Sequence, residues 1–172
     1  MDAELERQFL DHSVNKLEQY TTRIGTCLGM LNEDQIWARG GENENAIGNL
    51  VLHLSGNVRQ WIVSSVGGRP DTRDRDSEFA ASGGLSAGAL IERLSSTVKE
   101  AVEVIPKTAE RMAERLTIQG YEASVMEAIY HVVEHLAMHT GQILFASKML
   151  TGADLGFYAH LRSQAAHGQK TP

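Results

Sequence analysis

Apolar residues recur at helical spacing along two long stretches of the chain that contain no proline. In the first stretch, a stripe with one threonine in it follows alternating steps of four and three residues: Leu10, Val14, Leu17, Thr21, Ile24, Leu28 and Leu31. This spacing predicts a helix over residues 4–30. A glycine-containing loop follows, and Asn43 or Asn45 is expected to cap a second helix that ends near Ser65.

Capping residues and helix breakers predict where the remaining helices begin and end. Ser86 is placed to cap a third helix, and Pro106 is placed to end it. A last long helix is expected to begin between Tyr121 and Ser124 and to stop at Gly152, because glycine readily adopts the left-handed conformation of a C-cap. A weak extended signal just before this helix is too short to predict a sheet.

Two segments interrupt the helical pattern. Residues 67–85 hold a proline, mixed charges and two glycine pairs, so an irregular surface crossing is expected there. After Gly152, a docked turn around residues 155–161 and a frayed tail over residues 163–172 are expected. No internal repeat divides the chain. The pattern therefore predicts one all-α domain over residues 1–172, built as an antiparallel four-helix bundle.

Composition narrows the class of protein further. The 172 residues include 16 basic and 22 acidic side chains without a block of like charges, so nucleic acid is not an expected partner. The acidic start of the chain and the lack of a run of about 18 apolar residues predict neither a secretory signal nor a membrane span. The one cysteine, Cys27, falls beside the apolar stripe of the first helix, where a buried, inert thiol is expected. A cytoplasmic protein is the expectation.

Histidines are the informative polar residues of the last helix. His131, His135 and His139 follow one another at steps of four, so about 40° separates neighbours and all three share one face. Gln142 falls on the same face. A single histidine on an apolar face is usually a hydrogen-bonded core residue. Two histidines at this spacing are different, because their Nε2 atoms can converge on one ion, as in helical zinc sites.

His53, in the second helix, is the candidate third ligand. It lies on the flank of that helix's apolar stripe, and Asn49 and Asn57 lie one turn before and after it. The two asparagines are interpreted either as polar residues of the helix surface or as residues that line a site. One histidine from this helix and two from the last would leave a fourth position of the ion open, which is the pattern of catalytic rather than structural zinc.

Two stretches, IGNLVLHLSGNVRQW and VVEHLAMHTGQI, resemble the DinB-like superfamily. That superfamily includes YfiT-type metal-dependent proteins and thiol-dependent transferases related to mycothiol maleylpyruvate isomerase. In it, a histidine of the second helix and both histidines of an H-x-x-x-H-x-G-Q motif bind a divalent metal. The resemblance implies that His53, His135 and His139 are the ligands here, with Gly141 and Gln142 matching the final G-Q. It also implies a four-helix bundle of the DinB/YfiT type with an unusual connection, commonly dimeric.

The stretch from His131 to His135 also matches the H-x-x-E-H order of inverted zinc peptidases, in which Glu134 would be the base. We interpret this match as accidental, because Glu134 points about 100° away from His135. His131 is then expected to line the cavity or to hold a hydrogen bond to a carboxylate such as Glu127. Trp61 is interpreted as core or as a pocket wall.

Other polar residues carry weaker signals. Four arginines could bind the carboxylates of a thiol cofactor, although solvated charges are the simpler interpretation: Arg59, Arg69, Arg73 and Arg75. Three histidines have no partner at ligand spacing and are expected at the surface: His12, His160 and His167. Gln142 is expected to orient a metal ligand or to cap a neighbouring helix end, because an amide oxygen is a poorer donor than imidazole for zinc or nickel.

Together with the resemblance, these residues predict a homodimeric metalloprotein that holds zinc or nickel. Such an ion lowers the pKa of a bound water or of a low-molecular-weight thiol toward neutrality, so both hydrolysis and thiol transfer are open. The alternative is a noncatalytic bundle that senses or stores a ligand or metal, or that serves as an interaction module. The sequence does not indicate a substrate.

Overall fold

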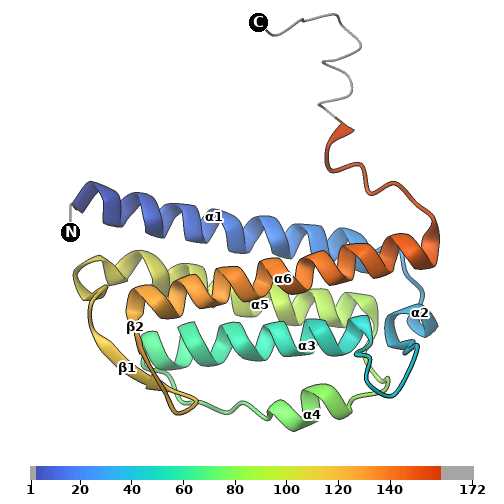
Figure 1. Cartoon of the computed structure of the whole chain (residues 1–172), viewed down its shortest axis with the longest axis horizontal. Coiled ribbons are helices and arrows are strands. Elements are labelled where there is room, and N and C mark those ends of the chain that lie inside the picture. Colours follow the sequence, from blue (N-terminus) through green and yellow to red (C-terminus); the bar gives the residue numbers. More distant parts are fainter. Residues whose placement is uncertain (1–2, 160–172) are drawn as a thin grey trace, which may run out of the picture.

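Four long helices lie side by side in the computed structural model, which describes residues 3–159 (Figure 1). They are α1 (Ala3–Leu28), α3 (Ile47–Val58), α5 (Ala87–Val104) and α6 (Val125–Thr151). The chain is mostly helical, so the expected all-α class is correct in broad terms. Side chains from all four helices are fully buried in the shared interior: Leu17, Ile24, Leu54, Leu94, Ile129 and Leu136.

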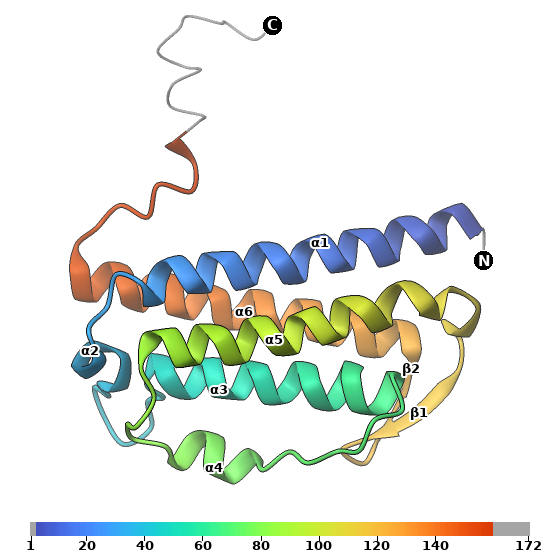
Figure 2. The same cartoon turned by 180° about the vertical axis from the view of Figure 1, so that it is seen from behind.

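The helices do not follow a simple up-and-down order. In Figures 1 and 2 the chain runs one way along α1 and α6 and the opposite way along α3 and α5. α1 packs against both α6 and α5, and α3 packs against both α5 and α6. The expected antiparallel arrangement therefore applies to the pairs α1–α5 and α3–α6, whereas α1–α6 and α3–α5 are parallel neighbours. A long crossing between α3 and α5 makes this possible, because it returns the chain to the end at which α3 began.

The crossing contains a helix that its composition did not predict. α4 (Arg75–Ala80) begins after Asp74, whose side chain accepts a hydrogen bond from the backbone N–H of Ser77 at 3.1 Å. It packs along α3, as Figure 2 shows. The irregular surface crossing expected over residues 67–85 is thus partly an ordered helix that covers one face of α3.

The second predicted helix ends at Val66, close to its expected end near Ser65. Its start differs from the prediction, and its last part is not α-helical. α3 passes without a break into η1 (Arg59–Val66), a π-helical segment, and such segments are frequent at functional sites. The predicted cap at Asn43 or Asn45 is wrong, because α3 begins after Ala46. The Asn49 side chain accepts the Ala46 backbone N–H at 3.1 Å, so this buried backbone donor at the start of the helix is satisfied from inside the first turn.

The predicted ends of the other long helices are confirmed. Ser86 and Ser124 cap α5 and α6, and Gly152 ends α6 in the left-handed conformation with φ of 66°. α5 ends two residues before Pro106, and a 3₁₀ turn, η2 (Ile105–Arg111), follows it. Proline suits this position, because the first turn of a helix does not use its missing N–H.

Two short elements were not predicted. The weak extended signal forms an antiparallel hairpin of β1 (Arg115–Ile118) and β2 (Tyr121–Ser124), contrary to the expectation that it was too short. Gln119 and Gly120, with φ of 55° and 81°, supply the two-residue turn that such hairpins favour. Between α1 and α3 lies the one-turn helix α2 (Glu33–Trp37).

None of the helices in residues 3–159 combines the length and the apolar character that a membrane crossing requires. The docked turn expected around residues 155–161 lies partly, and the tail expected over residues 163–172 lies wholly, outside the described residues.

Candidate metal centre

Three histidines from two helices come together between α3 and α6. His53 lies on α3, and His135 and His139 lie one turn apart on α6. One ring nitrogen of each lies within 4.8 Å of the others, and His53 Nε2 is 2.8 Å from His135 Nε2. His53 is buried and the other two are half-buried, so the α6 side of the cluster is the more open one. These three residues could hold a metal ion.

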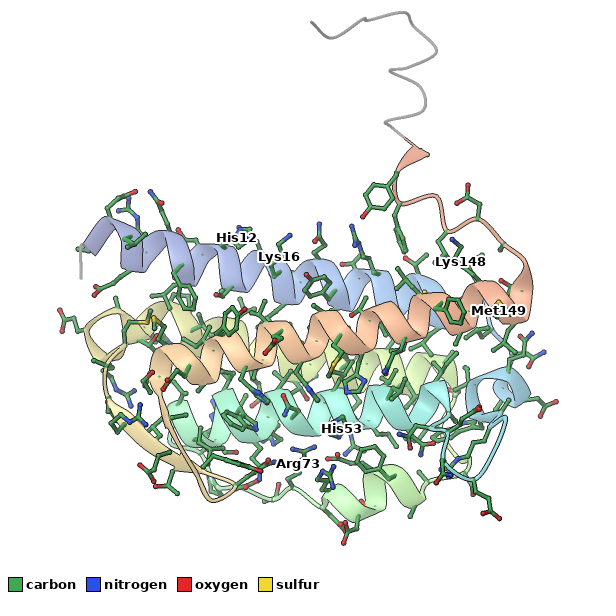
Figure 3. All side chains as sticks on the ribbon, in the orientation of Figure 1. His12, Lys16, His53, Arg73, Lys148 and Met149 are labelled. Atoms are coloured by element: carbon green, nitrogen blue, oxygen red, sulfur yellow. The ribbon has the colours of Figure 1, made fainter. Side chains whose placement is uncertain are left out.

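The other ring nitrogen of His53 faces a buried ion pair from the crossing. Glu78 Oε2 lies 3.2 Å from His53 Nδ1, and Arg73 donates to the two carboxylate oxygens at 2.8 Å each. The side chains of Arg73 and Glu78 are only 3% and 5% exposed. Figure 3 shows His53 and Arg73 on the side of α3 that faces α4. Glu78 carries no signal in the sequence that marks it for this site, and the interpretation of Arg73 as a solvated charge is wrong.

Two neighbours with opposite requirements surround His53 Nδ1. Arg73 Nη2, at 3.1 Å, can only donate a hydrogen bond, whereas the Glu78 carboxylate can only accept one. With the ring proton on Nε2, Arg73 donates to Nδ1 and the proton lies between His53 and His135. With the proton on Nδ1, Glu78 accepts it and Nε2 is free to coordinate. Glu78 therefore makes the metal-binding tautomer of His53 available.

Burial and charge favour neutral imidazoles beside an ionised carboxylate. Burial alone raises the pKa of Glu78, but hydrogen bonds from Arg73 and His53 outweigh it, and the pKa lies below its ordinary value. Burial, followed by the neighbouring imidazoles and Arg73, lowers the pKa of His135 to about 3. Burial also lowers the pKa of His139. Neutral imidazole is the form that binds metals, so these two rings lose no proton on binding at neutral pH.

Asn49 and Gly56 hold the crossing against α3. Asn49 is fully buried, and its Nδ2 donates to the backbone oxygens of Glu78 at 2.9 Å and of Ala81 at 2.7 Å. Its Oδ1 accepts from Arg39 at 2.9 Å. A Cβ at Gly56 would overlap the carboxylate of Glu78, so glycine permits the close approach. Asn49 is thus neither a surface residue nor part of the cluster, but it anchors the segment that supplies Glu78.

Gln142 holds the third histidine from outside the cluster. Its Oε1 lies 2.7 Å from His139 Nδ1, so the amide oxygen can accept the Nδ1 proton and leave Nε2 unprotonated. Two of the three rings thus have an acceptor at Nδ1, a carboxylate for His53 and an amide for His139. Acceptors in these positions orient imidazoles and increase their basicity toward metals.

Beyond the cluster, His131 of α6 faces one side chain from the end of α3 and one from η1. Trp61 stacks on His131 with ring centroids 4.0 Å apart, and Asn57 Nδ2 lies 3.3 Å from His131 Nε2. His131 stacks in turn on His135 at 5.4 Å, and burial lowers the pKa of His131. Asn57 Oδ1 and Trp61 Nε1 are buried without a hydrogen-bond partner among the described residues. Trp61 and Asn57 therefore support His131 rather than touch the three-histidine cluster.

The expected hydrogen bond from His131 to Glu127 is wrong. Glu127 closes the capping box of α6 with Ser124 and pairs with Arg115 at 2.9 Å. The peptidase-like interpretation gains no support either, because His131 is not one of the three converging histidines and Glu134 is exposed.

The donor set fits a borderline ion such as zinc. Nitrogen ligands at about 2.0–2.1 Å from a tetrahedral ion lie about 3.3 Å apart. The Nε2 atoms of His53 and His135, at 2.8 Å, would have to separate by about 0.5 Å, and any wider separation in the cluster, which reaches at most 4.8 Å, would have to close toward about 3.3 Å. Three imidazoles leave room for a further ligand.

The remaining sequence candidates lie elsewhere. Arg59 and Arg69 pair with Glu100 at 2.9 and 3.4 Å, and Arg75 is exposed. Cys27 is buried, and burial raises the pKa of its thiol, in agreement with the expected inert cysteine.

Of the three histidines expected at the surface, His12 is exposed on α1, away from His53 in Figure 3. His160 and His167 lie outside the described residues.

A family model described as "Protein of unknown function (DUF1572)" matches residues 4–161 of the chain. No curated protein matches the chain significantly. The match extends over both helices that carry the three histidines and over the crossing that carries Glu78.

Proposed function

The chain belongs to the family described as protein of unknown function (DUF1572), and we propose that it is a DinB-like metalloprotein whose His53, His135 and His139 bind zinc or nickel. The observation that carries the proposal is the convergence of three imidazoles, two of which have an acceptor at Nδ1. Imidazole donors suit zinc and nickel better than magnesium or calcium.

The proposed fold type is the DinB-type four-helix bundle. It is supported by the parallel neighbours α1–α6 and α3–α5 and by the long crossing between α3 and α5. The homodimer that the resemblance implies, and the cytoplasmic location, remain predictions.

The proposed activity is hydrolysis or thiol transfer. A bound ion would supply Lewis acidity, which lowers the pKa of a water or thiol toward neutrality. The residues of the chain would bind the ion and orient the imidazole rings that hold it. Glu78 and Gln142 hold His53 and His139 by their Nδ1 atoms, and burial keeps His135 neutral.

Metal analysis of the full chain purified without an affinity tag tests the proposed centre. Wild-type protein is expected to hold stoichiometric metal after purification and again after chelation and reloading. His135→Ala is expected to lose it, whereas His12→Ala, an exposed histidine on α1, is the matched control. Unchanged metal content in His135→Ala would reject the centre.

An activity screen separates catalysis from the noncatalytic alternative. Thiol conjugation and ester or amide hydrolysis are measured for reloaded protein, with chelated protein as the control. Turnover that requires both the metal and His135 supports the enzyme, and metal binding without turnover of any tested substrate supports a sensor or interaction module.

A further inference from the structure

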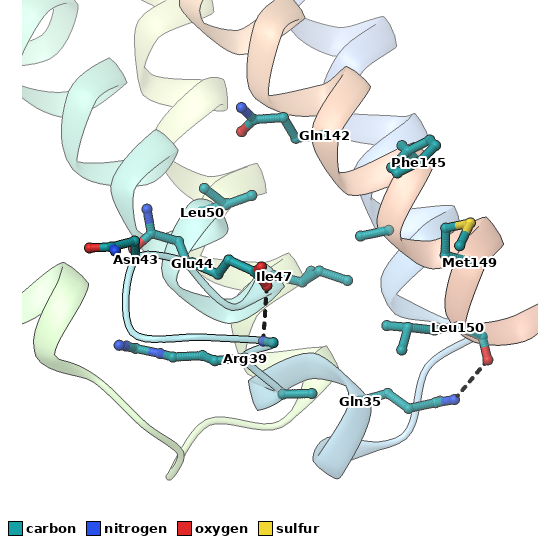
Figure 4. A pocket seen from close by; sticks show the side chains of 14 residues that line it. Gln35, Arg39, Asn43, Glu44, Ile47, Leu50, Gln142, Phe145, Met149 and Leu150 are labelled. Carbon is teal, nitrogen blue, oxygen red and sulfur yellow. Dashed lines mark hydrogen bonds between the residues drawn. The ribbon is translucent and has the colours of Figure 1, made fainter.

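A cleft of about 720 Å³ opens between the start of α3 and the last turns of α6 (Figure 4). Its volume lies within the range of about 300–1,000 Å³ that is usual for small-molecule sites. The apolar part of its lining comes from both helices: Ile47, Leu50, Phe145, Ala146, Met149 and Leu150. The loop after α2 forms its third side.

The cleft adjoins the histidine cluster on both helices. Gln142 lines the cleft, and the same side chain accepts a hydrogen bond from His139 at 2.7 Å. Leu50 lines the cleft three residues before His53, about 4.5 Å along the helix axis. One end of the cleft therefore lies within about one helical turn of two of the three histidines.

Hydrogen bonds hold the loop side of the cleft in place. Gln35 Nε2 donates to the Leu150 backbone oxygen at 3.4 Å, and Glu44 accepts the Gly40 backbone N–H at 3.0 Å, as the dashed lines of Figure 4 show. The guanidinium of Arg39 donates to backbone oxygens of the crossing at 2.7 and 3.0 Å. Because these side chains already bind groups of the protein, the loop side of the cleft is held in place without a ligand, and Gln142 is the polar side chain of the helical walls.

Two large side chains of the α6 wall are left open to solvent. Phe145 is 69% exposed and Met149 is 72% exposed. Exposed apolar side chains that lie together are typical of binding surfaces, whereas single ones need no explanation. An apolar group laid between them and Leu50 would remove this surface from water.

We propose that the cleft binds the acyl or alkyl chain of the substrate and so places the polar, reacting end of that substrate at the three histidines. This inference rests on the metal centre proposed above and names the class of molecule that the centre acts on, a small amphiphile with an apolar tail. An ion held by His53, His135 and His139 would bind the head, and the wall of Phe145, Ala146 and Met149 selects the tail.

Two hydroxamates of different chain length test this inference on the full, zinc-loaded chain. Hydroxamates coordinate zinc, so acetohydroxamate reports on the metal and octanohydroxamate reports on the metal and the cleft together. A fully buried methylene is worth about fourfold in affinity, and octanohydroxamate has about six more of them than acetohydroxamate. With half of that tail buried, it is expected to bind about 60-fold more tightly to wild-type protein by calorimetry.

Variants of the α6 wall assign the gain to the cleft. Ala146→Trp, which fills the cleft, is expected to abolish the chain-length gain and to leave acetohydroxamate affinity and metal content unchanged. Should that variant fold poorly, Phe145→Ser/Met149→Ser removes the exposed wall at positions that do not support the core. Tyr130→Ser is the matched control, because Tyr130 is 59% exposed on the same helix but does not line this cleft.

Each alternative outcome has a separate meaning. Equal affinity for the two probes in wild-type protein, or a gain that survives in both wall variants, would overturn the inference. A dimer that dissociates in Phe145→Ser/Met149→Ser while the gain persists would assign this wall to a second copy of the chain. Failure of wild-type protein to hold zinc or acetohydroxamate would reject the metal centre itself and the inference with it.

Discussion

Glu78→Ala is expected to weaken metal binding and to destabilise the fold, for two different reasons. The carboxylate is the acceptor for His53 Nδ1 at 3.2 Å, and it is the counter-charge of Arg73, whose side chain is 3% exposed. Loss of a carboxylate that orients a ligating histidine costs about 10- to 100-fold in metal affinity. Removal of one partner from a buried ion pair costs about 3–5 kcal/mol, because the other charge is left buried alone.

Replacement of both charges separates the two effects. In Arg73→Met/Glu78→Leu no buried charge remains, and apolar residues of similar volume are often neutral or stabilising in place of a buried pair. We therefore expect the free energy of unfolding to return close to that of the wild type. Metal affinity should stay about 10- to 100-fold below wild type, because leucine cannot accept the Nδ1 proton of His53. Glu78→Gln should do the reverse, retaining an acceptor oxygen while leaving Arg73 without a counter-charge.

Urea unfolding of chelated protein measures stability, and competition with a chromophoric chelator measures zinc affinity. If zinc affinity returns together with stability in the double variant, Glu78 acts on the metal only through the fold. If Glu78→Gln binds zinc as weakly as Glu78→Ala, the acceptor at His53 Nδ1 is not what matters. Either result would refute the assignment of Glu78 as a positioning residue.

Three further predictions concern His135, Gln142 and Cys27. The lowered pKa of His135, about 3 in the folded protein against about 6.5 in an unfolded chain, means that the unfolded state gains a proton first. The free energy of unfolding of the chelated protein should therefore hold its whole contribution from His135 above about pH 6.5 and lose it as the pH drops toward 3. An equally steep pH profile in His135→Ala would contradict the assignment of this pH dependence to His135. Gln142→Ala, at an exposed position, should lower zinc affinity about 10- to 100-fold without loss of helicity, and unchanged affinity would show that the amide does not orient His139. Cys27 should react with a thiol reagent in urea but not in the native protein, and rapid native labelling would refute its burial.

The helices could be predicted because their signals are local. The apolar stripe of α1, the serine caps at Ser86 and Ser124 and the C-cap at Gly152 all act within one or two turns of the chain. The cap at Asn43 or Asn45 failed for a related reason. α3 begins after Ala46, which has no capping side chain, and the side chain of Asn49, three residues into the helix, instead accepts the backbone N–H of Ala46. A local pattern shows which residues could cap a helix, but it does not determine which of them does.

The candidate site also combines residues that have a local signal in the sequence with one residue that has none. The ladder of His135 and His139 is a short-range pattern, whereas His53 was a weaker candidate from its place beside the apolar stripe of the second helix, which the resemblance to the DinB-like superfamily then supported. Glu78 had no such signal, because its role depends on packing against α3, 25 residues earlier in the chain. The mixed charge of its segment predicts a solvated loop, and neither charge pattern nor helical period distinguishes a buried ion pair from exposed charges.

The topology and the candidate site depend on one segment. The crossing returns the chain along α3, which is why α5 runs parallel to α3, and the same passage brings Arg73 and Glu78 against His53. A simple up-and-down bundle would join α3 to its neighbour by a short loop and leave that face of α3 uncovered. His53 Nδ1 would then face water, which does not distinguish between the two tautomers of the ring. The unusual connection thus supplies, in Glu78, an acceptor for the Nδ1 proton of His53, which leaves Nε2 of that ring free to coordinate a metal.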